Sequence, residues 1–170
     1  MGGRYCIDRK NIEINDLRDK ISTLESDLRK SKFEPKLLKT PSAADIISRT
    51  NDYRSTKGLG ILRENQKLKE SACLKEHDMI DNNYWAHISP NGVEPWYWFD
   101  RAGYMYQRAG ENLSYGFGNN KRLVDGWIDS PEHNKNLVGE YTQTGVCTKF
   151  SDIFHELHTW VTVAHYALPK

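Results

Sequence analysis

Near the start of the chain, hydrophobic residues recur at helical spacing in a segment that is otherwise rich in charge and poor in aromatic residues. Five of them alternate in steps of three and four, at Ile14, Leu17, Ile21, Leu24 and Leu28. This spacing predicts an amphipathic helix within residues 8–34. Because about three heptads are marginal for a free-standing coiled coil, the stripe is expected to pack on the following domain or on another chain.

After Pro41 the pattern changes to that of a globular domain in which helix signals come first. Ser42, followed by Asp45, resembles a capping box and predicts a helix that ends at Gly58. Apolar residues at helical spacing and nearby stop signals predict three more helices, over residues 64–80, 94–102 and 120–128.

The last third of the chain carries the strand signals. Residues 142–150 and 159–167 are rich in Thr, Val, Trp and Tyr, and a loop through Asp152 and Glu156 joins them. Helices that come early and antiparallel strands that come late are typical of an α+β fold. The chain is therefore divided into an N-terminal tether helix with its linker, residues 1–40, and a globular domain, residues 41–170.

Composition narrows the class of protein. The 170 residues fit one domain plus an appendage, and 11% aromatic residues predict an aromatic-rich core. Twenty-four basic against twenty-three acidic residues leave no excess charge that would favour nucleic acid as a partner. No apolar run is long enough for a membrane span, and nothing near Met1 resembles an export signal. The Gly-rich start resembles a cloning scar, so we expect that the native leader is missing.

The three cysteines do not have metal-binding spacing and are too few for a disulfide scaffold. A bridge between Cys73 and Cys147 is one interpretation. Two buried free thiols are the interpretation that the sequence favours, because cysteine is often buried unpaired.

Histidines next to helix or loop signals are the first candidates for chemistry. Ser130 before Pro131 indicates a helix start with a serine cap, which places His133 in the first turn. The positive end of the helix dipole disfavours imidazolium there, so His133 is expected to be neutral and free to bind a metal. His155 and His158 stand three residues apart in a predicted loop, whereas zinc proteases need two histidines four apart on a helix.

Several motifs occur together in a fixed order and carry a family resemblance. They are Asn51-x-x-Arg54, Tyr84-x-x-His87-x-Ser89-Pro90-x-Gly92, Gly110-Glu111-Asn112-Leu113, Trp127-x-x-Ser130-Pro131-x-His133-x-x-Asn136-Leu137 and Gly145-Val146. In this order they resemble the CAP superfamily of cysteine-rich secretory proteins, antigen 5 and pathogenesis-related 1 proteins. The resemblance covers residues 43–167 and is greatest to the bacterial SCP-like branch, which the small number of cysteines also favours.

The resemblance implies a three-layer α-β-α sandwich with a central antiparallel sheet and a cleft lined by two histidines and acidic residues. His87 and His133 match the cleft histidines, and Glu111 matches the first cleft glutamate. Where many relatives have a second glutamate, this chain has Asp129 and Ser130. The predicted binding cleft therefore consists of His87, Glu111, Ser130 and His133.

Two neutral imidazoles beside a carboxylate suit an open Zn²⁺ site, with His87 and His133 as the metal ligands and Glu111 orienting them. The same three residues could also act as an acid and base without a metal. A structural role is expected as well, because Gly110, Glu111 and Asn112 are predicted to lie where the chain turns.

Three classes of function follow from the resemblance. The first, which we favour, is a secreted or surface-exposed module that binds an unknown small ligand, a lipid or a host or envelope protein. The others are a hydrolase, most simply a peptidase, and a lipid or sterol carrier. We expect no robust peptidase turnover, because Ser89 and Ser130 are poor nucleophile candidates. Cys6 stands ahead of a polar segment, as the acylated cysteine of a bacterial lipoprotein does. The three residues before it lack the small and apolar character of a lipobox, which favours an ordinary residue over a lipoprotein.

Overall fold

The computed structural model describes residue 17, residues 20–24 and residues 41–170, in two units, Met1–Leu38 and Lys39–Lys170. In the first unit Leu17 and residues 20–24 are helical, and the side chains of Leu17, Ile21 and Leu24 are exposed. The remaining stripe positions and Cys6 lie outside the described residues. Among the residues described, no helix combines the length and the apolar character that crossing a bilayer requires.

The second unit is built around a four-stranded sheet with the strand order β1-β3-β4-β2. Its strands are β1 (Arg63–Glu64), β2 (Tyr106–Tyr115), β3 (Gln143–Phe154) and β4 (Leu157–Pro169). The β3–β4 pair is antiparallel, as predicted. The β2–β4 pair is antiparallel too, although the sequence did not predict β2, and the two residues of β1 run parallel to β3. The sheet is therefore mixed, and β1 is too short to leave a periodic signal in the sequence.

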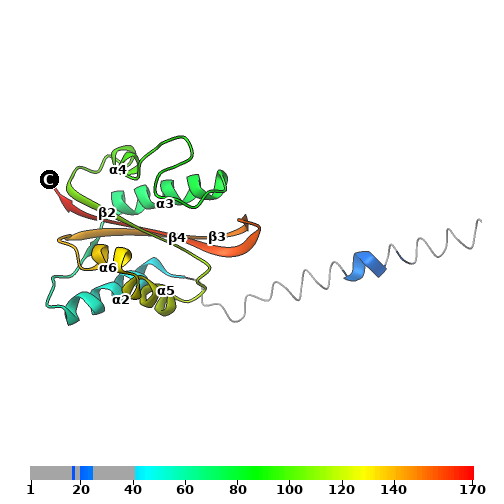
Figure 1. Cartoon of the computed structure of the whole chain (residues 1–170), viewed down its shortest axis with the longest axis horizontal. Helices are drawn as coiled ribbons and strands as arrows, with labels where there is room; N and C mark the ends of the chain where they lie inside the picture. The colour runs from blue at the N-terminus through cyan, green and yellow to red at the C-terminus, as the bar shows by residue number, and fades with distance from the viewer. Residues whose placement is uncertain (1–16, 18–19, 25–40) are drawn as a thin grey trace, which may run out of the picture. The chain divides into compact units, whose positions relative to one another are not determined.

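Helices cover both faces of this sheet (Figure 1). One layer contains α3 (Gln66–Asp81) and α4 (Trp96–Arg101), and the other contains α2 (Ala43–Thr56), α5 (Asn120–Asp129) and α6 (Pro131–Leu137). This arrangement confirms the predicted α+β class and the helix-sheet-helix layering. The predicted helices were correctly located because their apolar spacing coincides with the faces that pack on the sheet.

Alternation along β4 sends successive side chains to opposite layers. Val161 and Val163 pack with Met79 of α3, whereas Ala164 and Tyr166 pack in the other cluster with Trp127 of α5. Both faces of β4 are thus buried, which explains why its sequence is an almost continuous apolar run.

The prediction of a turn at Gly110, Glu111 and Asn112 was wrong, because all three lie within β2. Asn112 is fully buried and Glu111 nearly so, and both make side-chain hydrogen bonds inside the protein. Polar residues that are buried on both faces of a strand remove the alternation by which a strand is recognised in sequence. The loop predicted through Asp152 is also shorter than expected, since β3 continues to Phe154.

The helix starts were placed correctly but for partly wrong reasons. Ser42 and Ser130 occupy the residues before α2 and α6, yet neither side chain makes a capping hydrogen bond. The side chains that do cap helices are Asn65, before α3, and Asn119, before α5. For α6, the proline at its first position is what the sequence signal correctly identified.

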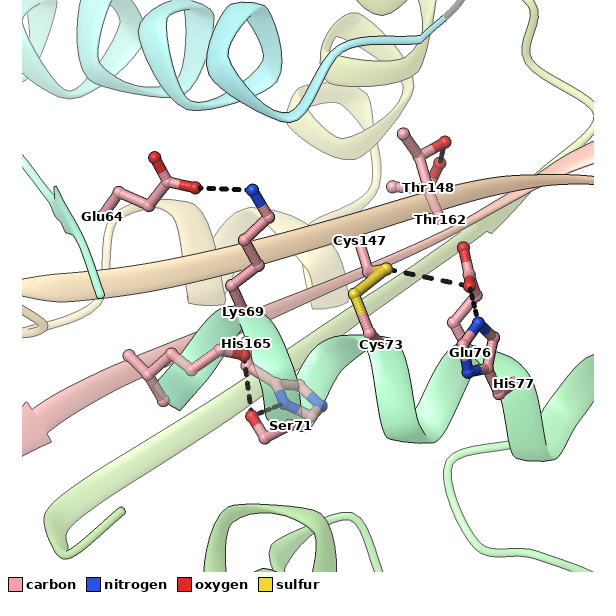
Figure 2. The surroundings of a disulfide bond; sticks show 11 residues. Glu64, Lys69, Ser71, Cys73, Glu76, His77, Cys147, Thr148, Thr162 and His165 are labelled. Atoms are coloured by element: carbon pink, nitrogen blue, oxygen red, sulfur yellow. Dashed lines mark hydrogen bonds and ion pairs between the residues drawn. A yellow bond between two sulfur atoms is a disulfide. The ribbon is translucent and has the colours of Figure 1, made fainter. Parts of the chain in front are cut away.

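Cys73 of α3 and Cys147 of β3 form a disulfide bond, so the expectation of two free thiols was wrong (Figure 2). The helix packs unusually close to the strand at this point. A Cβ atom added to Gly145 would lie 2.0 Å from the backbone nitrogen of Lys69. This close approach brings the two cysteine Cα atoms to 5.0 Å, a separation that a disulfide spans and that the sequence alone does not reveal.

Candidate functional site

The candidate site is built around Glu111 on the edge strand β2. His165 stands directly opposite Glu111 on β4, and its Nε2 lies 3.0 Å from Oε2 of the carboxylate. On the other carboxylate oxygen, Oε1, His87 Nδ1 lies at 2.6 Å. One buried carboxylate therefore joins a fully buried histidine to a histidine whose side chain is 54% exposed.

Glu111 is ionised in this setting. Burial alone would raise the pKa of the Glu111 carboxyl, but hydrogen bonds from His165 and His87 and the positive charge of Lys75 lower it below its ordinary value. A carboxylate can only accept hydrogen bonds, so His87 donates through Nδ1–H. Nε2 of His87 is consequently the ring nitrogen that is left for a ligand.

Lys75 fixes the loop that carries His87. This fully buried lysine of α3 donates through Nζ to the hydroxyl of Tyr84 and to the backbone oxygens of Ala86 and His87, at 2.8–2.9 Å. Burial lowers the pKa of the Lys75 amine, and the negative charges of Glu111 and Asp78 oppose that shift. The loop is therefore held by a desolvated cation rather than by apolar packing alone.

A pocket of about 360 Å³ lies beside this cluster. It is lined by residues of the His87 loop, α4, β2 and α6, namely His87, Ile88, Glu94, Pro95, Trp96, Ala109, Gly110, Glu111 and Asn136. Two of the four predicted cleft residues, His87 and Glu111, are thus brought together at its wall. Ser130 and His133 are not among the lining residues.

His133 lies close enough to His87 to be affected by its charge. Burial is the main cause that lowers the pKa of His133, and repulsion from the His87 ring in its protonated form lowers it further. His133 is therefore neutral, as expected, although burial rather than the helix end is the leading cause. Its backbone oxygen accepts a hydrogen bond from Asn112 Nδ2 at 3.1 Å, which ties α6 to β2.

Side chains of α6 and the following loop close the open edge of β2. Asn136 Nδ2 donates to the backbone oxygen of Glu111 and to Oδ1 of Asn112, at 2.9 and 2.8 Å. Tyr141 donates its hydroxyl to the backbone oxygen of Ala109. These contacts crowd Gly110, where an added Cβ would lie 2.6 Å from Oδ1 of Asn136 unless that side chain shifted. They explain physically why glycine precedes Glu111.

The side chains present would supply only part of a metal ion's coordination shell, so they suit an open metal site in which water or a ligand completes the shell. Nε2 of His87, with Glu111 behind the ring, and the neutral ring of His133 are chemically suitable ligands for Zn²⁺. Within residues 41–170 and the short described stretch before them, no three His, Cys, Asp or Glu side chains are grouped so that they could hold a metal. His155 and His158 lie at the β3–β4 hairpin and do not line the pocket.

Sequence reasoning missed His165, Ser71 and Lys75. Ser71 Oγ lies 2.7 Å from His165 Nδ1, and Phe99 stacks on the imidazole ring with the centroids 4.5 Å apart. The sequence feature that could have identified Lys75 and His165 is a polar residue at a position where the apolar pattern predicts the core. Lys75 occupies the helical stripe of Leu68, Ala72 and Met79, and His165 stands in an apolar strand.

Comparison with known proteins agrees with this architecture. The sequence model of the CAP family, described as the cysteine-rich secretory protein family, matches residues 47–163 of this chain. The uncharacterized protein YkwD of Bacillus subtilis is 34% identical over 102 residues, which are 59% of this chain and 40% of YkwD. The chain thus spans less than half the length of that relative.

Solved structures with the same fold were also found. An extracellular protein of Bacillus anthracis that contains an SCP domain is 28% identical, with a TM-score of 0.64, over 74% of this chain and 39% of that one. An outer surface protein of Borrelia burgdorferi is similar in fold, at 18% identity and a TM-score of 0.67, over 75% of this chain and 92% of that protein.

Proposed function

This chain belongs to the cysteine-rich secretory protein (CAP) family, and we propose that it is an extracellular or surface-exposed binding module. In this proposal the pocket at the edge of β2 takes a small ligand or a divalent cation, and His87 is the residue that contacts it. The observation that carries the proposal is the Glu111 carboxylate, which joins buried His165 to half-exposed His87 beside the pocket.

The pocket supports a small occupant. Its volume of about 360 Å³ is near the lower end of ligand sites, which range over about 300–1,000 Å³. Ile88, Pro95 and Trp96 supply apolar walls, and His87, Glu94 and Glu111 supply polar groups. Such a site fits a small molecule or one side chain of a peptide better than a sterol.

A divalent metal is part of the proposal. His87 and His133 would hold Zn²⁺, and the bound ion would supply a positive centre for an anionic ligand or for water. Glu111 keeps Nδ1 of His87 protonated by accepting its hydrogen bond, so Nε2 presents its lone pair. Burial of His133 keeps that ring neutral, which a metal ligand must be.

The hydrolase alternative is not favoured by any contact at the pocket. Ser89 Oγ accepts a hydrogen bond from the backbone of Val93 at 3.0 Å, which fits a role in the turn. Neither Ser89 nor Ser130 is among the residues that line the pocket. We therefore expect purified protein to show no robust peptidase turnover with or without Zn²⁺.

The proposed location rests on two supports. The Cys73–Cys147 disulfide fits an oxidising compartment, since stable disulfides are rare where thiols are kept reduced. The Bacillus anthracis protein that shares the domain is described as extracellular. Protease treatment of intact cells that make the full gene product should remove the domain, and complete protection together with recovery in the cytosolic fraction would contradict this location.

A titration with Zn²⁺ alone tests the binding site. Imidazole NMR resonances of His87 and His133 should shift together, and His87→Ala should abolish the shift of His133. His158→Ala is the matched control, because His158 is an exposed histidine on the hairpin and should leave the pocket response unchanged. Shifts confined to His155 and His158, or an unaffected His87 at millimolar Zn²⁺, would contradict the proposal.

A further inference from the structure

A second group of reactive side chains lies between α3 and β3, and none of its members lines the pocket. It consists of the Cys73–Cys147 disulfide and the carboxyl group of Glu76 (Figure 2). Glu76 follows Cys73 by three residues on α3, so both side chains lie on one face of the helix. Oε2 of Glu76 lies 3.7 Å from Sγ of Cys147, and the Glu76 residue is fully buried.

The carboxyl group of Glu76 has few hydrogen-bond partners. Among the described residues, Oε1 has no hydrogen-bond partner. The groups that face the carboxyl are His77 of α3, whose Nε2 lies 3.7 Å from Oε2, and the positive charge of Lys149 on β3. A buried ionised carboxylate with one unpaired oxygen is costly, so this arrangement favours the protonated acid.

Electrostatics agree with that assignment. Burial raises the pKa of the Glu76 carboxyl to about 8, and Lys149 opposes only part of the shift. Near neutral pH, Glu76 therefore carries a proton and places it within reach of a disulfide sulfur. Cys73 and Cys147 are both only partly buried, and the exchange proposed below requires that an incoming thiol reach Sγ of Cys73.

We propose that Cys73–Cys147 is a thiol–disulfide exchange site in which Glu76 is the proton donor to Cys147. Cys147 packs against the apolar cluster of α3 and β4, where a thiolate is disfavoured. When Glu76 donates its proton, Cys147 leaves as a neutral thiol, so cleavage of the bond does not place a thiolate in the apolar cluster. The co-reactant is a dithiol, such as the reduced cysteine pair of an oxidoreductase.

The exchange balances in two steps. One thiol of the dithiol loses its proton to solvent, and the thiolate attacks Sγ of Cys73. The Cys73–Cys147 bond breaks, and Sγ of Cys147 takes the proton from Glu76. The second thiol of the dithiol then loses its proton to solvent, and its thiolate attacks the reagent sulfur of the mixed disulfide. This attack releases Cys73, which takes a proton from solvent, as does Glu76. Two electrons pass from the dithiol, which becomes a disulfide, to the cysteine pair.

This exchange site lies on the helix that supports the candidate pocket. Ser71 and Lys75 are each two residues from Cys73, and they contact His165 and the backbone of His87. Breaking the covalent link between α3 and β3 therefore acts on the element that holds both histidines of the Glu111 cluster.

The test is the rate of disulfide reduction by dithiothreitol in the full chain between pH 6 and pH 10. Rates are divided by the concentration of reagent thiolate, so that only the protein contributes to the pH profile. Wild type is compared with Glu76→Gln, which keeps the shape of the side chain but cannot transfer the proton. Glu70→Gln is the matched control, because Glu70 is an exposed glutamate on the same helix.

The corrected wild-type rate should be constant at low pH and fall above pH 8, whereas the Glu76→Gln profile should be flat. Wild type should be about tenfold faster than Glu76→Gln at pH 6.5 and slower at pH 9.5, because the ionised carboxylate then repels the leaving thiolate. If Glu76→Gln does not fold, the wild-type profile tests the proposal by itself. A fall in the corrected rate above pH 8 supports it, and a flat profile contradicts it. Identical flat profiles, or a rate independent of dithiothreitol concentration because global unfolding limits it, would overturn the proposal.

Discussion

The two faces of the sheet differ in what they bury. The face covered by α2, α5 and α6 encloses a mainly apolar cluster, with Arg54 donating to backbone oxygens of Gly60, Leu137 and Gly139 as its principal charged member. Among the described residues, the face covered by α3 and α4 buries four Lys, Glu or His side chains near one another along the helix and sheet: Lys75, Glu76, Glu111 and His165.

This difference places most of the buried charge beside the candidate chemistry. Burying a charged group is unfavourable unless it is paired, so a face that holds several of them gives up free energy that an apolar core would provide. Perturbed titratable groups beside a pocket are typical of functional sites. Apart from His133 of α6, the residues of the candidate chemistry therefore lie on the α3 face, which also encloses two apolar clusters and the disulfide.

The largest effect is expected at the closest contact of the α3 face. Gly145→Ala places a Cβ 2.0 Å from the backbone of Lys69, and a backbone atom cannot move aside as a flexible side-chain end can. The substitution should lower the free energy of unfolding by about 3 kcal/mol or more in urea denaturation. Gly60→Ala is the control, since nothing lies within 4 Å of the added atom, and equal losses in both would contradict the packing argument.

The pH dependence of stability should distinguish the two faces next. The pKa of Glu76 is about 8 in the folded protein against an ordinary value of 4.5, so the folded state holds a proton that the unfolded state releases. Its stabilisation is complete below pH 4.5 and is lost as the pH rises through 8, with a slope of about 1.4 kcal/mol per pH unit.

Glu76→Gln should remove that slope, as measured by urea denaturation at intervals between pH 5 and pH 8. Val124→Ala, on the α2 face, should lower stability by the same amount at every pH, because it removes only apolar contact. Wild type and Glu76→Gln with parallel profiles would show that Glu76 is ionised in the folded protein.

Removing the buried cation should loosen the pocket without unfolding the domain. Lys75→Met leaves the backbone oxygens of Ala86 and His87 without their donor, which should cost about 1–3 kcal/mol. Amide hydrogen exchange in the His87 loop should accelerate. Lys69→Met, a half-exposed lysine of the same helix, should change stability by no more than about 0.5 kcal/mol, and an equal effect of both would contradict the special role of Lys75.

A smaller effect is expected at the edge of β2, where the two faces meet. An added Cβ at Gly110 would be too close to Oδ1 of Asn136 and to the Tyr141 hydroxyl, but both are side-chain ends that can shift. Gly110→Ala should therefore cost about 1 kcal/mol and weaken the Zn²⁺ response of His87. A larger loss than that of Gly145→Ala would reverse the predicted order.

The sequence was sufficient for elements whose pattern is local. The helices were recognised because apolar spacing and stop residues such as Gly58 lie close together in the chain. His87 and Glu111 were selected from motifs, and the structure places them in one hydrogen-bonded pair. The proposed roles of His133 and Ser130 stay predictions, since neither residue lines the pocket.

What the sequence did not reveal depends on distant partners. The disulfide joins residues 74 positions apart, and only the packing of α3 against β3 decides that pairing. The strand β2 was missed because Glu111 and Asn112 are polar yet buried, each satisfied by another element. His165 was missed because its partner on β2 is 54 residues away.

The central claim is that the Glu111 carboxylate holds His87 with Nδ1 protonated and Nε2 free. Long-range ¹H–¹⁵N correlation of the histidine rings measures this directly, because it assigns the proton of each neutral imidazole to one nitrogen. We expect the Nδ1–H form for His87 in wild type and its loss in Glu111→Ala, while Val124→Ala leaves it unchanged. A neutral His87 that carries its proton on Nε2 in the wild-type protein would contradict this claim.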